Sequence, residues 1–199
     1  MRNAEATRQR ILEAALAEFS AHGIAGARVD RIAQAAGCNK NLIYIYFTDK
    51  ETLFTTVLSR HLLRVHEEYP FTPDDLPGYA AKVFDFAMSN PDLMRLVAWS
   101  ALEDTRGWAE RVATLDAKLA ALTEAKKAGQ VGTAFPPDFL LVAVMSLATA
   151  WSVASPFGPS VNPKATDRPA AVRKSLIEAV RLLANAGKGA ATQRRSKKR

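Results

Sequence analysis

Apolar residues recur along most of this 199-residue chain with the spacing of an α-helix. In the segment 29–36 they fall three, four and seven residues after the first, which places them on one face of a helix. Gly37 follows directly, and a glycine at this place favours the left-handed conformation that ends a helix. Asn39 favours the start of a second helix over 40–46, because its side chain can accept a hydrogen bond from a free backbone N–H group. The pattern predicts two short helices joined by a turn of about three or four residues, which is a helix-turn-helix.

The second helix carries an unusual number of large side chains. Ile43 and Phe47 are spaced to reach a core, and the remaining residues are left on outer faces: Lys40, Asn41, Leu42, Tyr44, Ile45 and Tyr46. Exposing so many large side chains is unfavourable without a partner. A helix that combines positive charge, an amide and phenols suits the major groove of DNA.

The same spacing predicts helices on both sides of this motif. A first helix is expected over 4–22, with Asn3 as its cap. A fourth helix is expected to begin at a capping box in which Thr48 and Glu51 satisfy each other's backbone N–H groups, and to end near residue 69. Further helices are expected at 74–89, 91–102, 106–128, 137–154 and 167–186. The sequence has no internal repeat and no strand alternation of useful length, so the predicted fold class is all-α.

Three segments of the chain carry a resemblance to a known family. They are TRQRILEAALAEFSAHG at 7–23, VDRIAQAAGCNKNLIYIYF at 29–47 and DKETLF at 49–54. In this order and spacing they resemble the N-terminal pattern of the tetracycline-repressor (TetR) family of one-component bacterial regulators. Three linked segments are far more specific than a lone helix-turn-helix pattern. The resemblance implies a three-helix DNA-binding domain at 1–48 and a helical ligand-binding and dimerisation domain at 49–187.

The resemblance also implies which residues contact double-stranded DNA. Tyr44 and Lys50 match the family's usual phosphate contacts, which set register and affinity. The positions where the family reads bases hold Lys40, Asn41, Leu42 and Tyr46. Lys40 is suited to donate to guanine, and Asn41 to pair with adenine.

This chain departs from the commonest family pattern at three places. The family usually has Gly-Thr where this chain has Asn41-Leu42, and a second tyrosine where it has Ile45. Leu42 and Ile45 cannot hydrogen-bond through their side chains, so we expect contact with thymine methyl groups, with packing inside the domain as the alternative for both. Arg28 stands where a hydroxyl residue often caps the helix, and it is expected to reach a phosphate instead.

The uncharged segment 139–157 predicts a buried helix. Its several hydroxyl residues, its alanines and Pro156 argue against a membrane span. In the family the last two helices form a four-helix interface with a second subunit, which assigns 139–155 and 168–186 to homodimerisation. The residues assigned to this contact are Ala143, Leu147, Ala150, Ala154, Leu176, Val180 and Leu183. A dimer matches a pseudo-palindromic operator, because two-fold symmetry doubles the base contacts.

A family member usually holds a small-molecule effector inside its larger domain, and the effector releases the protein from DNA. The scarcity of interior charges here suggests a largely apolar ligand. Candidate lining residues are His66, Phe84, Met88, Leu96, Trp99, Leu119, Phe139 and Met145. The favoured alternative for each of them is a plain helical core, because aromatic and Met residues at helical spacing are what the interior of any helical bundle contains.

The net charge of +7 is concentrated at the end of the chain. Residues 188–199 contain six basic and no acidic residues, which leaves +1 for the rest. Such a tail is expected to be disordered, and it serves either as a solubilising end or as an arm for DNA phosphates. The second interpretation gives the alternative function, a non-specific DNA-binding protein driven by its basic tail.

Composition argues against an enzyme and for a reducing compartment. Cys38 is the single cysteine, so no internal disulfide can form, and no N-terminal signal sequence is visible, which together favour the cytoplasm. His61 and His66 miss the spacing of a helical metal pair, and no nucleophile elbow or phosphate-binding loop is present. We therefore expect no catalytic residues, no metal and no cofactor.

Overall fold

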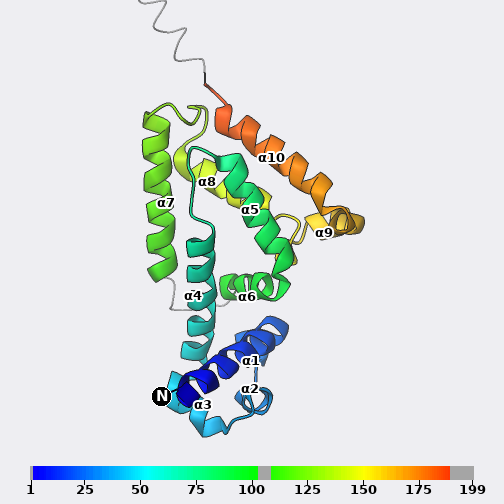
Figure 1. Ribbon diagram of the computed structural model, residues 1–199. Helices are drawn as coiled ribbons and strands as arrows, with labels where there is room; N and C mark the ends of the chain where they lie inside the picture. Colours follow the sequence, from blue (N-terminus) through cyan, green and yellow to red (C-terminus); the bar gives the residue numbers. More distant parts are fainter. Residues whose placement is uncertain (1, 103–108, 189–199) are drawn as a thin grey trace, which may run out of the picture. The chain divides into compact units, whose positions relative to one another are not determined.

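The computed structural model describes residues 2–102 and 109–188, and the regular structure in these ranges is helical (Figure 1). This confirms the all-α prediction. The chain divides into two compact units, one formed by residues 1–67 and 90–110 and the other by residues 68–89 and 111–199. The boundary expected after residue 48 therefore differs from the observed division. Two further helices group with the three N-terminal ones, and of the expected tail only Lys188 lies within the described residues.

The first unit contains α1 (Arg2–Gly26), α2 (Val29–Ala36), α3 (Lys40–Phe47), α4 (Lys50–Glu68) and α6 (Pro91–Leu102). Phe19 of α1 and Phe54 of α4 are fully buried in its core, where their rings pack edge to face with centroids 5.2 Å apart. α1 also packs along both α2 and α6. The helices of this unit are thus arranged around α1 as a common support.

The helix-turn-helix is formed as the sequence predicts. The predicted apolar face of α2 is buried, and Gly37 ends the helix with φ 62° and ψ 44°. The N–H of Gly37 donates to the carbonyl of Gln34, and the N–H of Cys38 donates to the carbonyl of Ala33, which is the Schellman arrangement. Asn39 then caps α3, because its side chain accepts from the N–H of Asn41 at 2.9 Å.

Two predicted helix caps are wrong. Asn3 lies inside α1, which begins at Arg2 and continues past a kink at Gly23 to Gly26. Thr48 has φ 62° and ψ −56° and sits at the centre of a tight turn, in which the N–H of Asp49 donates to the carbonyl of Phe47 at 2.6 Å.

Asp49 is the residue that caps α4. Its carboxylate accepts from the N–H of Thr52 at 2.6 Å, and this hydrogen bond holds the pKa of Asp49 below its ordinary value. The capping residue of α4 is therefore one position later in the chain than the predicted Thr48. Thr48 itself forms the turn that precedes the cap.

The second unit contains α5 (Leu76–Ser89), α7 (Ala109–Lys127), α8 (Pro137–Thr149), α9 (Gly158–Val161), a 3-10 turn (Pro163–Asp167) and α10 (Pro169–Asn185). α5 packs against both α8 and α10. Its core includes Phe84, Leu122 and Val144, which are fully buried. At the edge of this core Arg173 of α10 pairs with Asp85 of α5 at 2.9 Å.

The helix expected over 137–154 is shorter than predicted and ends at Thr149. The hydroxyls of Ser152 and Ser155 accept from backbone N–H groups two residues later, which offers this stretch an alternative to helical bonding. The chain then turns back so closely that a Cβ on Gly158 would collide with the carbonyl of Ala150. The helix α9 and the 3-10 turn that follow were not predicted. No helix among the described residues is long and apolar enough to cross a membrane.

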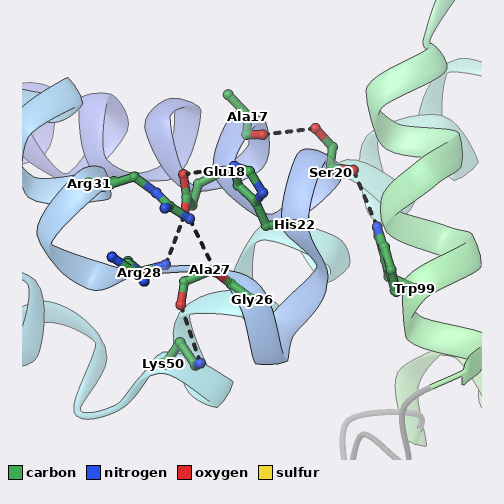
Figure 2. Close-up of polar contacts among 10 residues, drawn as sticks. All are labelled: Ala17, Glu18, Ser20, His22, Gly26, Ala27, Arg28, Arg31, Lys50 and Trp99. Atoms are coloured by element: carbon green, nitrogen blue, oxygen red, sulfur yellow. Dashed lines mark hydrogen bonds and ion pairs between the residues drawn. The ribbon is translucent and has the colours of Figure 1, made fainter.

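A carboxylate joins the end of α1 to the start of α2 (Figure 2). Glu18, whose side chain is 10% exposed, accepts from the N–H of Arg28 at 2.8 Å and from Nε of Arg31 at 2.8 Å. Arg31 also donates to the carbonyl of Gly26, and Nε2 of His22 lies 3.9 Å from the second Glu18 oxygen. Burial raises the pKa of Glu18, but the hydrogen bonds from Arg31 and the Arg28 backbone outweigh it, so the pKa lies below its ordinary value.

The same stretch of α1 is also attached to α6 and α4 within the first unit. Nε1 of Trp99 on α6 donates to the carbonyl of Ser20 at 3.3 Å (Figure 2). Nζ of Lys50 on α4 lies 3.4 Å from the carbonyl of Ala27. The end of α1 and the short link that follows it are therefore connected to α2, α4 and α6 by polar contacts.

We expect Glu18→Gln to lower the free energy of unfolding by about 2 kcal/mol. The amide removes the negative charge and turns an N–H group toward the N–H donors whose hydrogen bonds the Glu18 carboxylate accepts. Urea denaturation followed by circular dichroism measures this loss. Glu13→Gln is the matched control, since Glu13 lies on the same helix, is exposed and, among the described residues, accepts a local bond from Gln9. Equal stability of the two variants would contradict the assigned role of Glu18.

The stabilisation by Glu18 also depends on pH. A carboxyl group with a lowered pKa stabilises the fold above its ordinary pKa of 4.5, and the stabilisation is lost as the pH falls through the folded-state pKa. The difference in stability between the native protein and Glu18→Gln is therefore expected to shrink on acidification. A difference that stays constant from neutral to acid pH would contradict the charged interaction.

Candidate nucleic-acid interface

The outer face of α3 is the candidate interface. Ile43 and Phe47 are 1% and 2% exposed and anchor the helix, as predicted from their spacing. Asn41, Tyr44 and Ile45 are exposed, and Ile45 leaves 76% of its surface open to solvent. A short helix with a buried side and an open side of this composition has the form of a recognition helix for the major groove.

Two residues predicted to read bases are held by other parts of the same unit. Nζ of Lys40 pairs with the Asp30 carboxylate of α2 at 3.0 Å, and this hydrogen bond raises the pKa of Lys40. The hydroxyl of Tyr46, which is half-buried, donates to the carbonyl of Ala4 on α1 at 3.1 Å. Leu42 is half-buried as well. The structure therefore places Asn41, and not these three, as the freely presented member of the predicted base-reading set.

The candidate phosphate contacts lie around the two ends of the motif. Tyr44 is exposed on α3, and Lys50 occupies the first position of α4. Arg28 directly precedes α2, and its side chain is exposed and does not cap the helix. Its backbone N–H donates a hydrogen bond to Glu18. Within the described part of the chain neither Arg28 nor Lys50 forms an ion pair. The positive N-termini of α2 and α4 add to the attraction for phosphate.

Ile45 is the most exposed residue of this face, and the sequence left two alternatives open for it, contact with a thymine methyl group and packing inside the domain. Packing inside the domain was the alternative for both apolar residues of the helix, and the exposure of Ile45 removes that alternative for this residue. A signal for its exposure was present in the sequence. Ile45 lies midway between the two anchors Ile43 and Phe47 along the chain, and a residue two positions from each points to the opposite side of a helix.

The candidate effector residues are divided between the two units. His66, Leu96 and Trp99 belong to the first unit, where His66 is exposed and Leu96 is fully buried. The second unit holds Phe84, Met88, Leu119, Phe139 and Met145.

Most of the candidates in the second unit pack in or against its core. Phe84 is a core residue, and Met88, Leu119 and Met145 pack against the core. Phe139 is exposed and stacks on Phe135 with ring centroids 5.4 Å apart. None of these residues lines the groove of about 1070 Å³ that runs between α1 and α4 in the first unit. The predicted ligand site stays a prediction.

The candidate dimerisation residues occupy different environments. Leu176 and Val180 are buried in the core of their own unit, so they present no surface to a partner. Ala150 and Ala154 lie beyond the end of α8, because the helix stops at Thr149.

Other large apolar residues of α8 and α10 are exposed. Phe139 and Val142 are exposed on α8, and Leu182 is exposed on α10, which packs against α8. Ala143, Leu147 and Leu183 are half-buried on the same two helices.

No group of three or more potential metal ligands occurs among the described residues. Cys38 is half-buried in the turn between α2 and α3.

Comparison with known proteins agrees with this geometry. The family model of bacterial regulatory proteins of the tetR family matches residues 11–57, and the model of the tetracyclin repressor-like C-terminal domain matches residues 75–181. The chain is 40% identical over 159 residues to the HTH-type transcriptional repressor SCO4008 of Streptomyces coelicolor, covering 78% of this chain and 82% of that protein. It is 44% identical over 102 residues to the HTH-type transcriptional repressor NicS of Pseudomonas putida, which is 48% of each protein.

Solved structures show the same fold. The crystal structure of SCO4942 from Streptomyces coelicolor is 39% identical, has a TM-score of 0.78, and the match covers 87% of this chain and 96% of that chain. The structure of FadR from Bacillus subtilis in complex with stearoyl-CoA has a TM-score of 0.63 at 19% identity and covers 89% of this chain and 97% of that chain. The two matched family models and the extent of the identity show that the chain belongs to the TetR family of helix-turn-helix transcriptional regulators, a family of DNA-binding proteins and not of enzymes.

Proposed function

We propose that this protein represses transcription in the cytoplasm as a homodimer that binds a pseudo-palindromic operator and leaves it when a small, largely apolar ligand binds. The observation that carries the proposal is the outer face of α3. Its anchors Ile43 and Phe47 are buried, whereas Asn41, Tyr44 and Ile45 face solvent. One such helix contacts few base pairs, so sequence-specific binding requires the second copy that a dimer supplies.

The apolar surface of the second unit supports self-association. Val142 is 64% exposed on α8, and Leu182 is 61% exposed on the adjacent α10. Phe139 and Val142 lie three residues apart on α8, so they share one face of that helix. Exposed apolar side chains on two adjacent helices form a face suited to a four-helix contact with the same face of a second copy.

The proposed effector is supported by the character of the second unit. Its core is built from aliphatic, aromatic and Met side chains. Burial raises the pKa of Tyr79 to about 12, and the Tyr79 hydroxyl accepts from Nζ of Lys118 at 2.7 Å, so one cation stands beside this otherwise apolar core. A regulator with the same fold, FadR from Bacillus subtilis, was solved in complex with stearoyl-CoA. For ligand binding to weaken operator binding, the ligand and the operator must bind preferentially to different conformations of the protein.

The operator is tested by selecting random duplex DNA with the full-length protein at about 0.15 M salt, where non-specific phosphate contacts are weakened. Enrichment of an inverted repeat with half-site centres about 34 Å apart is the expected result. Enrichment of no sequence, together with binding that a truncation after Gly187 abolishes, would replace the proposal with a non-specific binder driven by the tail.

We expect Asp30→Asn to strengthen operator binding, because it releases Lys40 from its ion pair and removes a negative charge beside DNA. A released lysine that contacts phosphate makes the slope of log K against log salt steeper by about 0.9. Fluorescence anisotropy over a salt series measures both effects. Asp92→Asn is the control of equal charge change, since Asp92 pairs with Arg95 on α6 outside the motif. An Asp30→Asn protein that binds the operator no more tightly than the native protein would contradict a role for Lys40 at the interface.

We expect Val142→Glu to weaken the dimer about 100-fold or more, because the symmetric contact buries the new charge twice. Sedimentation equilibrium at micromolar concentration measures the change. Leu115→Glu is the control, since Leu115 is an exposed leucine on α7 of the same unit. A native protein that sediments as a monomer at these concentrations would contradict the proposed dimer.

A further inference from the structure

The rotation of α3 about its axis determines which of its side chains lies at the crest of the exposed face. At about 100° per residue, Ile43 and Phe47 lie about 40° apart, and Ile45 lies about 160° from each of them. Ile45 therefore points directly away from the buried side. Asn41 lies one turn earlier, about 40° from Ile45, on the same outer face.

The other large side chains of α3 lie on its flanks. Lys40 and Tyr44 follow one edge, and Lys40 is held there by Asp30. Leu42 and Tyr46 follow the other edge, and both are half-buried. Single exposed apolar side chains are common on protein surfaces, so the argument for Ile45 depends on its place at the crest and not on exposure alone.

A recognition helix that enters the major groove brings the crest of its outer face nearest to the base edges. The side chain of Ile45 has no donor or acceptor. On the base edges of this groove, the apolar group is the methyl group at C5 of a pyrimidine, which thymine and 5-methylcytosine share. The apolar side chain of Ile45 is therefore suited to pack against this methyl group.

We propose that Ile45 determines part of the operator specificity by packing against the 5-methyl group of a pyrimidine in each half-site. This inference rests on the proposed operator binding, assigns the methyl contact expected from the sequence to Ile45 alone, and extends it from thymine to any 5-methylated pyrimidine. The inference also gives different roles to the two apolar residues. Ile45 contacts the base, whereas Leu42 packs at the half-buried side of the helix.

Tyr46 is the positioning residue for this contact. Its hydroxyl donates to the carbonyl of Ala4 on α1, and its ring lies 6.1 Å from the ring of Phe47 between centroids. These contacts oppose rotation of α3, and a rotation would move Ile45 away from the crest. Tyr46→Phe removes only the hydroxyl, so it is expected to weaken the dependence on the methyl group without abolishing binding.

The test uses the inverted repeat obtained by selection and two series of synthetic duplexes. In the first series, each thymine of both half-sites is replaced in turn by deoxyuridine, which removes only the methyl group. In the second series, each cytosine is replaced by 5-methylcytosine, which adds only that group. A thymine contact gives a loss of affinity in the first series, and a 5-methylcytosine contact gives a gain in the second.

Burial of one methyl group changes affinity about fourfold per half-site, or about 15-fold for both half-sites of the repeat. We expect the native protein to show this change at one symmetric position. Ile45→Ala is expected to lose the dependence on the methyl group at that position, and Ile45→Val to keep part of it. Leu42→Ala is the matched control and is expected to keep the full dependence.

Two results would overturn the inference while leaving the proposed function intact. One is a native protein that is indifferent to both series. The other is an Ile45→Ala protein that responds to the methyl group as the native protein does. Ile45 is exposed, so its substitution is expected to leave the thermal unfolding midpoint unchanged, and Ile45→Val provides a second measurement. A selection that yields no inverted repeat would overturn the proposed function and this inference together.

Discussion

The burial of Ile43 and Phe47 is the constraint on which the exposed surface of the motif depends. A helix of eight residues is too short to be stable alone, so α3 exists because its inner face packs on the rest of the unit. The same burial determines the rotation of α3 and so determines that Ile45 faces solvent. Tyr46 and the Asn39 cap hold this rotation from the two ends of the helix.

The support for the motif comes from the end of α1. Glu18 binds the start of α2 through Arg28 and Arg31, and Trp99 of α6 donates to Ser20 on the same stretch. These contacts lie in one compact unit, which includes α4 and α6 as well as the three N-terminal helices. The compact unit that carries the candidate interface therefore includes more than the three helices of the DNA-binding domain that the family resemblance implies.

Internal ion pairs neutralise part of the positive charge of the helix-turn-helix. Lys40 is paired with Asp30 and Arg31 with Glu18, so much of the formal charge near α3 is already matched within the protein. The remaining charge outside the terminal residues 188–199 is only +1. Electrostatic attraction alone is therefore a weak source of selectivity, and the shape and chemistry of the outer face of α3 become correspondingly important.

The sequence by itself determined the elements whose signals are local. Gly37 and Asn39 act on the backbone within a few residues, so together with the apolar spacing they predicted the turn, the buried residues of both helices and the helix bounds to within one residue. Only the tertiary structure decided that Asp49 and not Thr48 caps α4, and that Val180 belongs to the core of its own unit. The physical reason is that a cap depends on the turn before it and burial depends on neighbouring helices, which the periodicity of one helix does not contain.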